Sequence, residues 1–150
     1  GLLRHYFDGI DALVAATYRA TGARVAAALH AAVDAVPTDN PRGRLLAFVT
    51  ASFRAPIADP ELLATWLAFW SLSRTVPAIG AIHDEIYADN RQDMERLIRA
   101  CPNAPADARL AAVALTALVD GLWLELSLGN APFSVDEAEA LAEKWLDSFI

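Results

Sequence analysis

The sequence predicts an all-α fold, a helical bundle of about seven helices. Alanine and leucine, both strong helix formers, dominate a chain of 150 residues of which 55% are hydrophobic. Apolar residues recur three and four positions apart through most of the chain, and no segment alternates as a half-buried strand does. Prolines and glycines mark the ends of these apolar runs. The length suits one domain around a single core.

Two helices are expected before the first proline-containing loop. The first is already under way at Gly1 and is expected to end near Phe7. Asp8 then has the character of an N-cap, with Asp11 in the first turn of a long second helix that ends before the loop at 37–41. The helical spacing of this second helix is carried by Ile10, Leu13, Val14, Tyr18, Val25, Leu29 and Val33.

Each of the next three helices begins at a proline. Asn40 and Asp59 stand before Pro41 and Pro60, which is a cap followed by proline at the first helical position, and Pro77 opens the third. The helix from Pro60 is apolar nearly all round, so it is expected to be central and buried. The apolar positions of the other two are Leu45, Phe48, Val49 and Phe53, and then Ile79, Ile82, Ile86, Met94 and Leu97.

The last two helices are expected at 106–128 and 134–149. Ser134 and Glu137 have the spacing of a capping box at the start of the final helix. The helix at 106–128 has two apolar faces, which indicates two partners, its own core and a second subunit. One face holds Leu110, Val113, Ala117, Gly121 and Leu124, and the other holds Leu115, Leu118, Leu122 and Leu126.

Charge and composition argue against a general nucleic-acid-binding surface, a membrane span and a secreted protein. The net charge of −7 argues against a general nucleic-acid-binding surface. Residues 1–25 have a net charge of +1 and the remainder −8, so any DNA contact is expected at the N-terminus. The apolar stretch Leu110–Leu128 contains Asp120 and Glu125, which makes a membrane span costly, and no signal peptide is expected. The single cysteine, Cys101, suits a reducing cytosol.

Enzymatic and metal-binding motifs are absent from the sequence. It has no Gly-rich phosphate loop, no GxSxG elbow and no HExxH. A di-iron bundle needs Glu-x-x-His pairs, and none of His5, His30 and His83 has a glutamate three residues earlier. We therefore expect no enzyme, no metal and no cofactor.

Three segments carry a family resemblance. GLLRHYFDGIDALVAATYR at 1–19 resembles the end of the recognition helix and the start of the linker helix in TetR-family repressors. WLAFW at 66–70 and DGLWL at 120–124 resemble the C-terminal domain of the BetI-type branch, whose founding member responds to choline. The resemblance implies a TetR-repressor-like C-terminal domain at 10–150 and a remnant of the DNA-binding helix-turn-helix at 1–9. The helices that precede the recognition helix in that family lie outside this sequence.

The resemblance also assigns DNA contacts. Arg4 and His5 are expected to point outward and touch DNA, while Tyr6 is either core or a phosphate contact. Gly9 and Ile10 stand where the family has Ser or Asn followed by Lys, so the usual lysine–phosphate contact is lost or moved.

A ligand pocket is expected among aromatic residues of the middle helices. Trp66 and Trp70 are four apart and share a helix face, which Phe69 widens. The alternative is that this group is simply bulk core. Aromatic faces attract quaternary ammonium groups, and an acid would complete such a site. The predicted lining is Phe53, Trp66, Phe69, Trp70, His83, Tyr87, Asn90, Asp120 and Trp123. His83 is otherwise a surface histidine, and Asn90 otherwise a satisfied core amide.

The function that the resemblance implies is a ligand-responsive, cytoplasmic transcriptional repressor, with a choline-like cation as the first candidate inducer. Ligand binding would favour a dimer whose recognition helices no longer match operator DNA. The predicted homodimer interface comprises Leu118, Gly121, Leu122, Leu124, Ala138, Leu141, Trp145 and Phe149. The rival hypothesis is a helical small-molecule carrier or protein-interaction module without DNA function.

Overall fold

The computed structural model describes residues 1–148 and 150, and the side chains of all of these except residues 5–8. The described chain is helical throughout, with six α-helices and one short 3₁₀ turn and no strand within that part. The all-α prediction is therefore confirmed.

Helix α1 (Leu2–Asp34) is longer than predicted, because the expected break near Phe7 and Asp8 is absent. One continuous helix replaces the two predicted ones, so the described chain has six α-helices rather than about seven. Residues 2–34 contain no proline, and a single glycine such as Gly9 costs a helix only about 1 kcal/mol relative to alanine. That cost does not outweigh the hydrogen bonds that continuing the helix adds.

The next helices begin where the caps predict. α2 (Pro41–Thr50) is capped by Asn40, whose Oδ1 accepts from the amide of Gly43 at 2.9 Å. It continues into a 3₁₀ turn, η1 (Ala51–Phe53). α3 (Pro60–Ser73) is capped by Asp59, which accepts from the amides of the first turn.

The remaining helices complete the bundle. α4 (Pro77–Ala100) begins at its proline as predicted. α5 (Ala108–Ser127) begins two residues later than predicted, because Asp107 caps it by accepting from the amide of Leu110 at 2.9 Å. α6 (Val135–Asp147) has the predicted capping box of Ser134 and Glu137.

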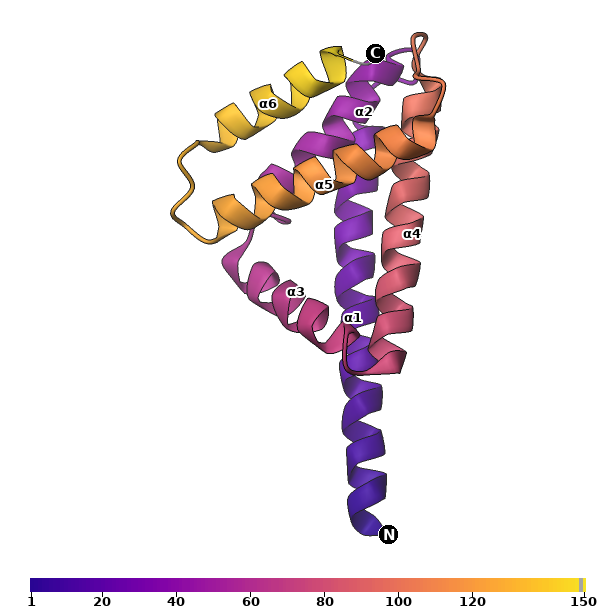
Figure 1. The fold of residues 1–150 in the computed structure, drawn as a ribbon, viewed down its shortest axis with the longest axis vertical. Coiled ribbons are helices and arrows are strands. Elements are labelled where there is room, and N and C mark those ends of the chain that lie inside the picture. The colour runs from indigo at the N-terminus through magenta and orange to yellow at the C-terminus, as the bar shows by residue number, and fades with distance from the viewer. Residues whose placement is uncertain (149) are drawn as a thin grey trace.

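α4 is the helix that holds the bundle together, since it packs against α1, α2, α3 and α5. α1 runs alongside α4, and its N-terminal part projects beyond the body (Figure 1). Leu2 in that projecting part is 87% exposed, while Tyr18 further along is fully buried. α5 and α6 lie side by side across the other end of the molecule (Figure 1). The body and the projecting end are therefore joined by one helix.

Helix α5 is long and apolar enough, by length and composition, to cross a membrane, and only a third of its apolar window is buried within the chain. One such helix is weak evidence for a span, because core helices pass the same test. Asp120 lies in the middle of α5, where a charged side chain in lipid would be costly.

Candidate ligand-binding cavity

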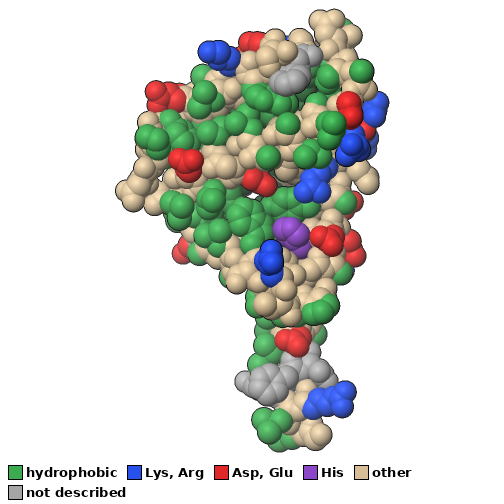
Figure 2. Space-filling view, viewed as in Figure 1, with side chains coloured by type: hydrophobic (Ala, Val, Ile, Leu, Met, Phe, Trp, Pro, Cys, Tyr) green, Lys and Arg blue, Asp and Glu red, His purple; other side chains and the backbone are tan. Residues whose placement is uncertain are grey.

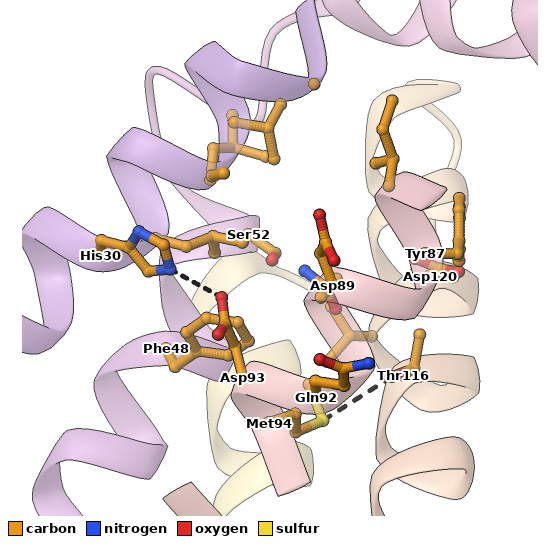
Figure 3. Close-up of a pocket in the computed structure, with 18 of the residues that line it drawn as sticks. His30, Phe48, Ser52, Tyr87, Asp89, Gln92, Asp93, Met94, Thr116 and Asp120 are labelled. Carbon is orange, nitrogen blue, oxygen red and sulfur yellow. Dashed lines mark hydrogen bonds and ion pairs between the residues drawn. The ribbon is translucent and has the colours of Figure 1, made fainter. Parts of the chain in front are cut away.

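A cavity of about 540 Å³ lies between α1, α2, α3, α4 and α5. Figure 3 shows His30, Phe48 and Ser52 on one side of it and Tyr87, Asp120 and Thr116 on the other. The volume falls in the range of pockets that enclose small organic molecules. Part of the wall is apolar, and its members are Val25, Leu29, Phe48, Val49, Ile57, Leu62, Trp66, Ile86, Met94, Val119 and Trp123.

Small residues of α1 create the space. Gly22, Ala23 and Ala26 line the cavity, and none has a side chain that would fill it. Gly22 also lets α1 approach α4 closely, because a Cβ there would lie 2.6 Å from Cδ1 of Ile86. The cavity thus lies beside the close crossing of α1 and α4, where the side chains of α1 are too small to fill the space.

The Tyr87 hydroxyl group organises the polar part of the wall. Its oxygen accepts from Nε1 of Trp66 at 3.3 Å and from Nε1 of Trp70 at 3.1 Å. Both lone pairs are then used, so its proton is left to donate to the carboxylate of Asp120. Burial, together with the negative charge of Asp120, raises the pKa of Tyr87, so this hydroxyl remains a donor at neutral pH.

Asp120 is a half-buried acid in the wall of the cavity. Burial raises the pKa of its carboxyl group to about 6, and the Tyr87 hydrogen bond and the charge of Arg91 offset part of that rise. The guanidinium of Arg91 lies over the Tyr87 ring, 5.5 Å from its centroid. None of the ion pairs between described residues involves Asp120.

The basic groups around the cavity are paired with acids. Arg19 of α1 bonds Glu85 of α4 at 2.7 Å, and His30 of α1 bonds Asp93 of α4 at 2.7 Å. Arg96 also contacts Asp93. The lining contains two arginines and four carboxylates, so with ionised acids the wall is net negative. A cationic ligand fits this wall better than an anionic one.

Five of the nine predicted pocket residues line the cavity, namely Trp66, Tyr87, Asn90, Asp120 and Trp123. Trp66 and Trp123 are also largely buried, so they belong to the core as well as to the wall. Nε1 of Trp123 donates to the carbonyl of Ile57 at 3.3 Å, which leaves its ring face as the part available to a ligand.

The other four predicted residues lie elsewhere. Phe53 is packed in the core of the chain. Phe69 stacks on Tyr18 at 4.0 Å between ring centroids. Trp70 reaches the site only through its hydrogen bond to Tyr87, and His83 bonds the Tyr18 hydroxyl instead. These four therefore lie outside the lining of this cavity, and on α3 it is Phe69 that the Tyr18 ring covers.

Sequence reasoning missed the contribution of α1. The periodicity predicts only a buried stripe on this helix, and the signal for a cavity is the small residues Gly22, Ala23 and Ala26. The polar residues Ser52, Gln92 and Thr116 were also missed, because single hydroxyl and amide groups in helices give no periodic pattern. Among the described residues, no group of three or more His, Cys, Asp or Glu side chains is placed to hold a metal ion.

The predicted DNA contacts and interface residues have the following positions. Arg4 is exposed near the projecting end of α1, whereas the side chains of His5 and Tyr6 lie outside the described residues.

The predicted interface residues differ in exposure. Gly121 and Leu141 are exposed, and Leu118, Leu122, Leu124 and Trp145 are half-buried. Ala138 is fully buried within its own chain and is removed from the interface, because it faces α6's own partners rather than solvent. Phe149 lies outside the described residues.

The raised pKa of Asp120 makes a testable difference to stability. The unfolded chain has an aspartate pKa of about 3.9, so the folded chain, with its pKa of about 6, binds this proton more tightly. The stabilisation from protonation is complete below pH ~4 and lost as the pH rises through ~6. Asp120→Asn keeps an oxygen to accept from Tyr87 and should raise the free energy of unfolding by about 1–3 kcal/mol at pH 8.

The gain should be smaller at pH 5.5, by on the order of 1 kcal/mol, and urea unfolding at the two pH values measures it. Asp39→Asn, in the exposed loop before α2, is the matched control and should change little at either pH. An equal gain for Asp120→Asn at both pH values would show that its carboxyl group titrates normally.

Comparison with known proteins gives a consistent result. Residues 41–150 match the family described as BetI-type transcriptional repressor, C-terminal. The chain is 37% identical over 149 residues to the HTH-type transcriptional regulator BetI of Burkholderia thailandensis, covering 98% of this chain and 74% of that protein. It is 33% identical over 155 residues to BetI 2 of Chromohalobacter salexigens, covering 100% of this chain and 72% of that protein.

A solved structure agrees with these relatives. The crystal structure of a protein described as a transcriptional regulator from Pseudomonas aeruginosa PAO1 superposes with a TM-score of 0.87 at 43% sequence identity. The match covers 99% of this chain and 73% of that one. These proteins are named as regulators, not enzymes, and the chain belongs to the BetI-type family of ligand-responsive transcriptional regulators.

Proposed function

We propose that residues 10–150 form the ligand-binding and dimerisation domain of a repressor, and that residues 1–9 belong to its DNA-binding head. A small cationic molecule in the cavity would favour the state that releases operator DNA. The observation that supports the cation is Asp120, a half-buried acid that lines the cavity together with the rings of Tyr87, Trp66 and Trp123. It forms no ion pair with another described residue. The relatives' names support operator DNA as the partner and the cytoplasm as the location.

The cavity offers a cation two kinds of stabilisation. Aromatic faces attract alkylammonium groups, with the largest effect when the ring and the cation are both withdrawn from water. The carboxylate of Asp120 adds direct charge pairing, which is stronger at a partly buried position than on the surface. A quaternary ammonium compound such as choline has no N–H to donate, so it needs this combination of rings and charge. This makes a choline-like cation the first candidate inducer.

A second copy of the chain is proposed to cover the outer face of α5. Figure 2 shows hydrophobic side chains gathered over α5 on one face of the molecule. Leu110 on this helix is 52% exposed, and Val113 and Gly121 are exposed on the same stripe. Leu141 of α6 extends the apolar surface. Two copies related by a two-fold axis would bury this surface and form a four-helix interface.

Calorimetry with choline and with betaine aldehyde tests the cation. Both compounds should release or absorb measurable heat with the unmodified chain at pH 8, where Asp120 is ionised. Asp120→Asn should weaken binding about tenfold or more, because it removes the charge and keeps the shape. Asp39→Asn removes an acid of the same type outside the cavity and should leave the affinity unchanged. Heat from neither compound would rule out this inducer class.

Operator binding tests the DNA-binding assignment. The protein expressed from its complete gene should bind its operator, and the double change Arg4→Ala with His5→Ala should cost about 1–3 kcal/mol of binding free energy at fixed salt. Arg99→Ala provides the control, because Arg99 is an exposed arginine near the C-terminal end of α4. Unchanged operator affinity in the double variant would remove Arg4 and His5 from the DNA interface.

Gly121→Arg tests the dimer without disturbing the subunit. A Cβ at Gly121 has nothing within 4 Å, so a single chain tolerates the substitution. In a four-helix interface the arginine would bring an unpaired charge into an apolar contact. Sedimentation at micromolar concentration should show a dimer for the unmodified chain and a monomer for Gly121→Arg. Ala88→Arg, at an exposed position of α4, should remain dimeric, and a monomeric unmodified chain would exclude the interface.

A further inference from the structure

Tyr18 is the first fully buried side chain of α1 from its N-terminal end, among the side chains that the structure describes. Its ring stacks on Phe69 with 4.0 Å between centroids and 8° between planes. It also meets the Trp66 ring edge-on at 5.6 Å. Its hydroxyl group lies 2.9 Å from Nδ1 of His83 on α4. Tyr18 thus fixes α1 to α3 and α4 at the point where α1 leaves the body.

Tyr18 is connected to the cavity wall through His83 and Tyr87. The rings of His83 and Tyr87, four residues apart on α4, have centroids 4.4 Å apart. The Tyr87 hydroxyl group then holds Trp66, Trp70 and, through its proton, Asp120. A continuous series of packed rings and hydrogen bonds therefore runs from Asp120 in the cavity to Tyr18 on α1.

The hydrogen bond between Tyr18 and His83 has a defined direction. Burial raises the pKa of Tyr18 to about 12, so its hydroxyl group keeps its proton. Burial lowers the pKa of His83, so the ring is neutral at neutral pH and Nδ1 accepts from Tyr18. The other ring nitrogen, Nε2, then carries the proton. A neutral ring packed between two tyrosines has one preferred orientation.

We propose that Tyr18 and His83 are positioning residues that couple the cavity wall at Tyr87 and Asp120 to the direction of α1. A ligand that moves Asp120 or Tyr87 would shift His83 against Tyr18. Because α1 is one helix, sixteen residues at ~1.5 Å each make a lever of about 24 Å from Tyr18 to Leu2. A change of ~5° at Tyr18 moves the tip by about 2 Å. This inference rests on the proposed function, since it describes how ligand binding would reach the DNA end.

Hydrogen exchange of the 150-residue chain tests the coupling without any ligand. Tyr87→Phe removes the hydroxyl group at the cavity and keeps the ring beside His83. It should accelerate amide exchange of residues 12–22 by about threefold or more. Tyr18→Phe should do the same, because it removes the hydrogen bond to His83. The double variant should exchange no faster than Tyr18→Phe alone, since both changes act through one connection.

The controls separate coupling from general loosening. Thr116→Val changes another cavity residue, whose hydroxyl group donates to the carbonyl of Ala112, and should leave residues 12–22 unchanged. Exchange in α6 should stay constant in all variants. Should Tyr87→Phe fold poorly, Trp70→Phe removes one donor to the same hydroxyl group and takes its place.

Two results would overturn the proposal. One is unchanged exchange of residues 12–22 in Tyr87→Phe and in Trp70→Phe. The other is a double variant in which the two effects multiply, because independent effects would mean that Tyr87 and Tyr18 act separately. Neither result bears on inducer binding, which calorimetry measures on its own.

Discussion

The Tyr87 hydroxyl group joins three helices through one oxygen atom. It accepts from two tryptophans of α3 and donates to Asp120 of α5, while its own backbone belongs to α4. Each partner is withdrawn from water to some degree, so an unmade bond here would leave a polar group without compensation. The positions of α3 and α5 relative to α4, and with them the polar side of the cavity, depend on this network. A charged ligand beside Asp120 would act directly on it.

The apolar side of the cavity depends on the small side chains of α1. Close packing of α1 against α4 would ordinarily fill the space between them, because protein interiors are packed to the density of organic crystals. Gly22 allows the close approach, and the neighbouring alanines supply too little volume to fill the cavity beyond it. The Arg19–Glu85 ion pair and the His30–Asp93 hydrogen bond join the same two helices along the cavity. The crossing thus combines the packing of Gly22 against Ile86 with polar contacts at the surface, and it leaves a cavity between the helices.

The fold was largely predictable from the sequence because its signals are local. Caps at Asn40, Asp59 and Ser134 mark helix starts through hydrogen bonds within one turn, and the structure confirms them. The break expected at Asp8 was wrong, since a cap residue favours a helix start without forcing one.

The pocket was only partly predictable from the sequence. Periodicity places Trp66 and Trp70 on one face of α3, but it does not say that Tyr18 of α1 fills the space before that face.

The distribution of charge around the cavity supports the proposal of a cationic ligand. The arginines that line the cavity are already paired with acids, Arg19 with Glu85 of the facing helix and Arg96 with Asp93 of its own helix, so they contribute little net field inside it. None of the ion pairs between the described residues involves Asp120, and burial makes its ionised form costly. A ligand that carries a positive charge would compensate that cost, whereas a neutral ligand would leave it and an anion would add to it. Under the proposed function, a bound cation would recover part of this cost, and Tyr87 would link Asp120 through His83 to the contacts of α1.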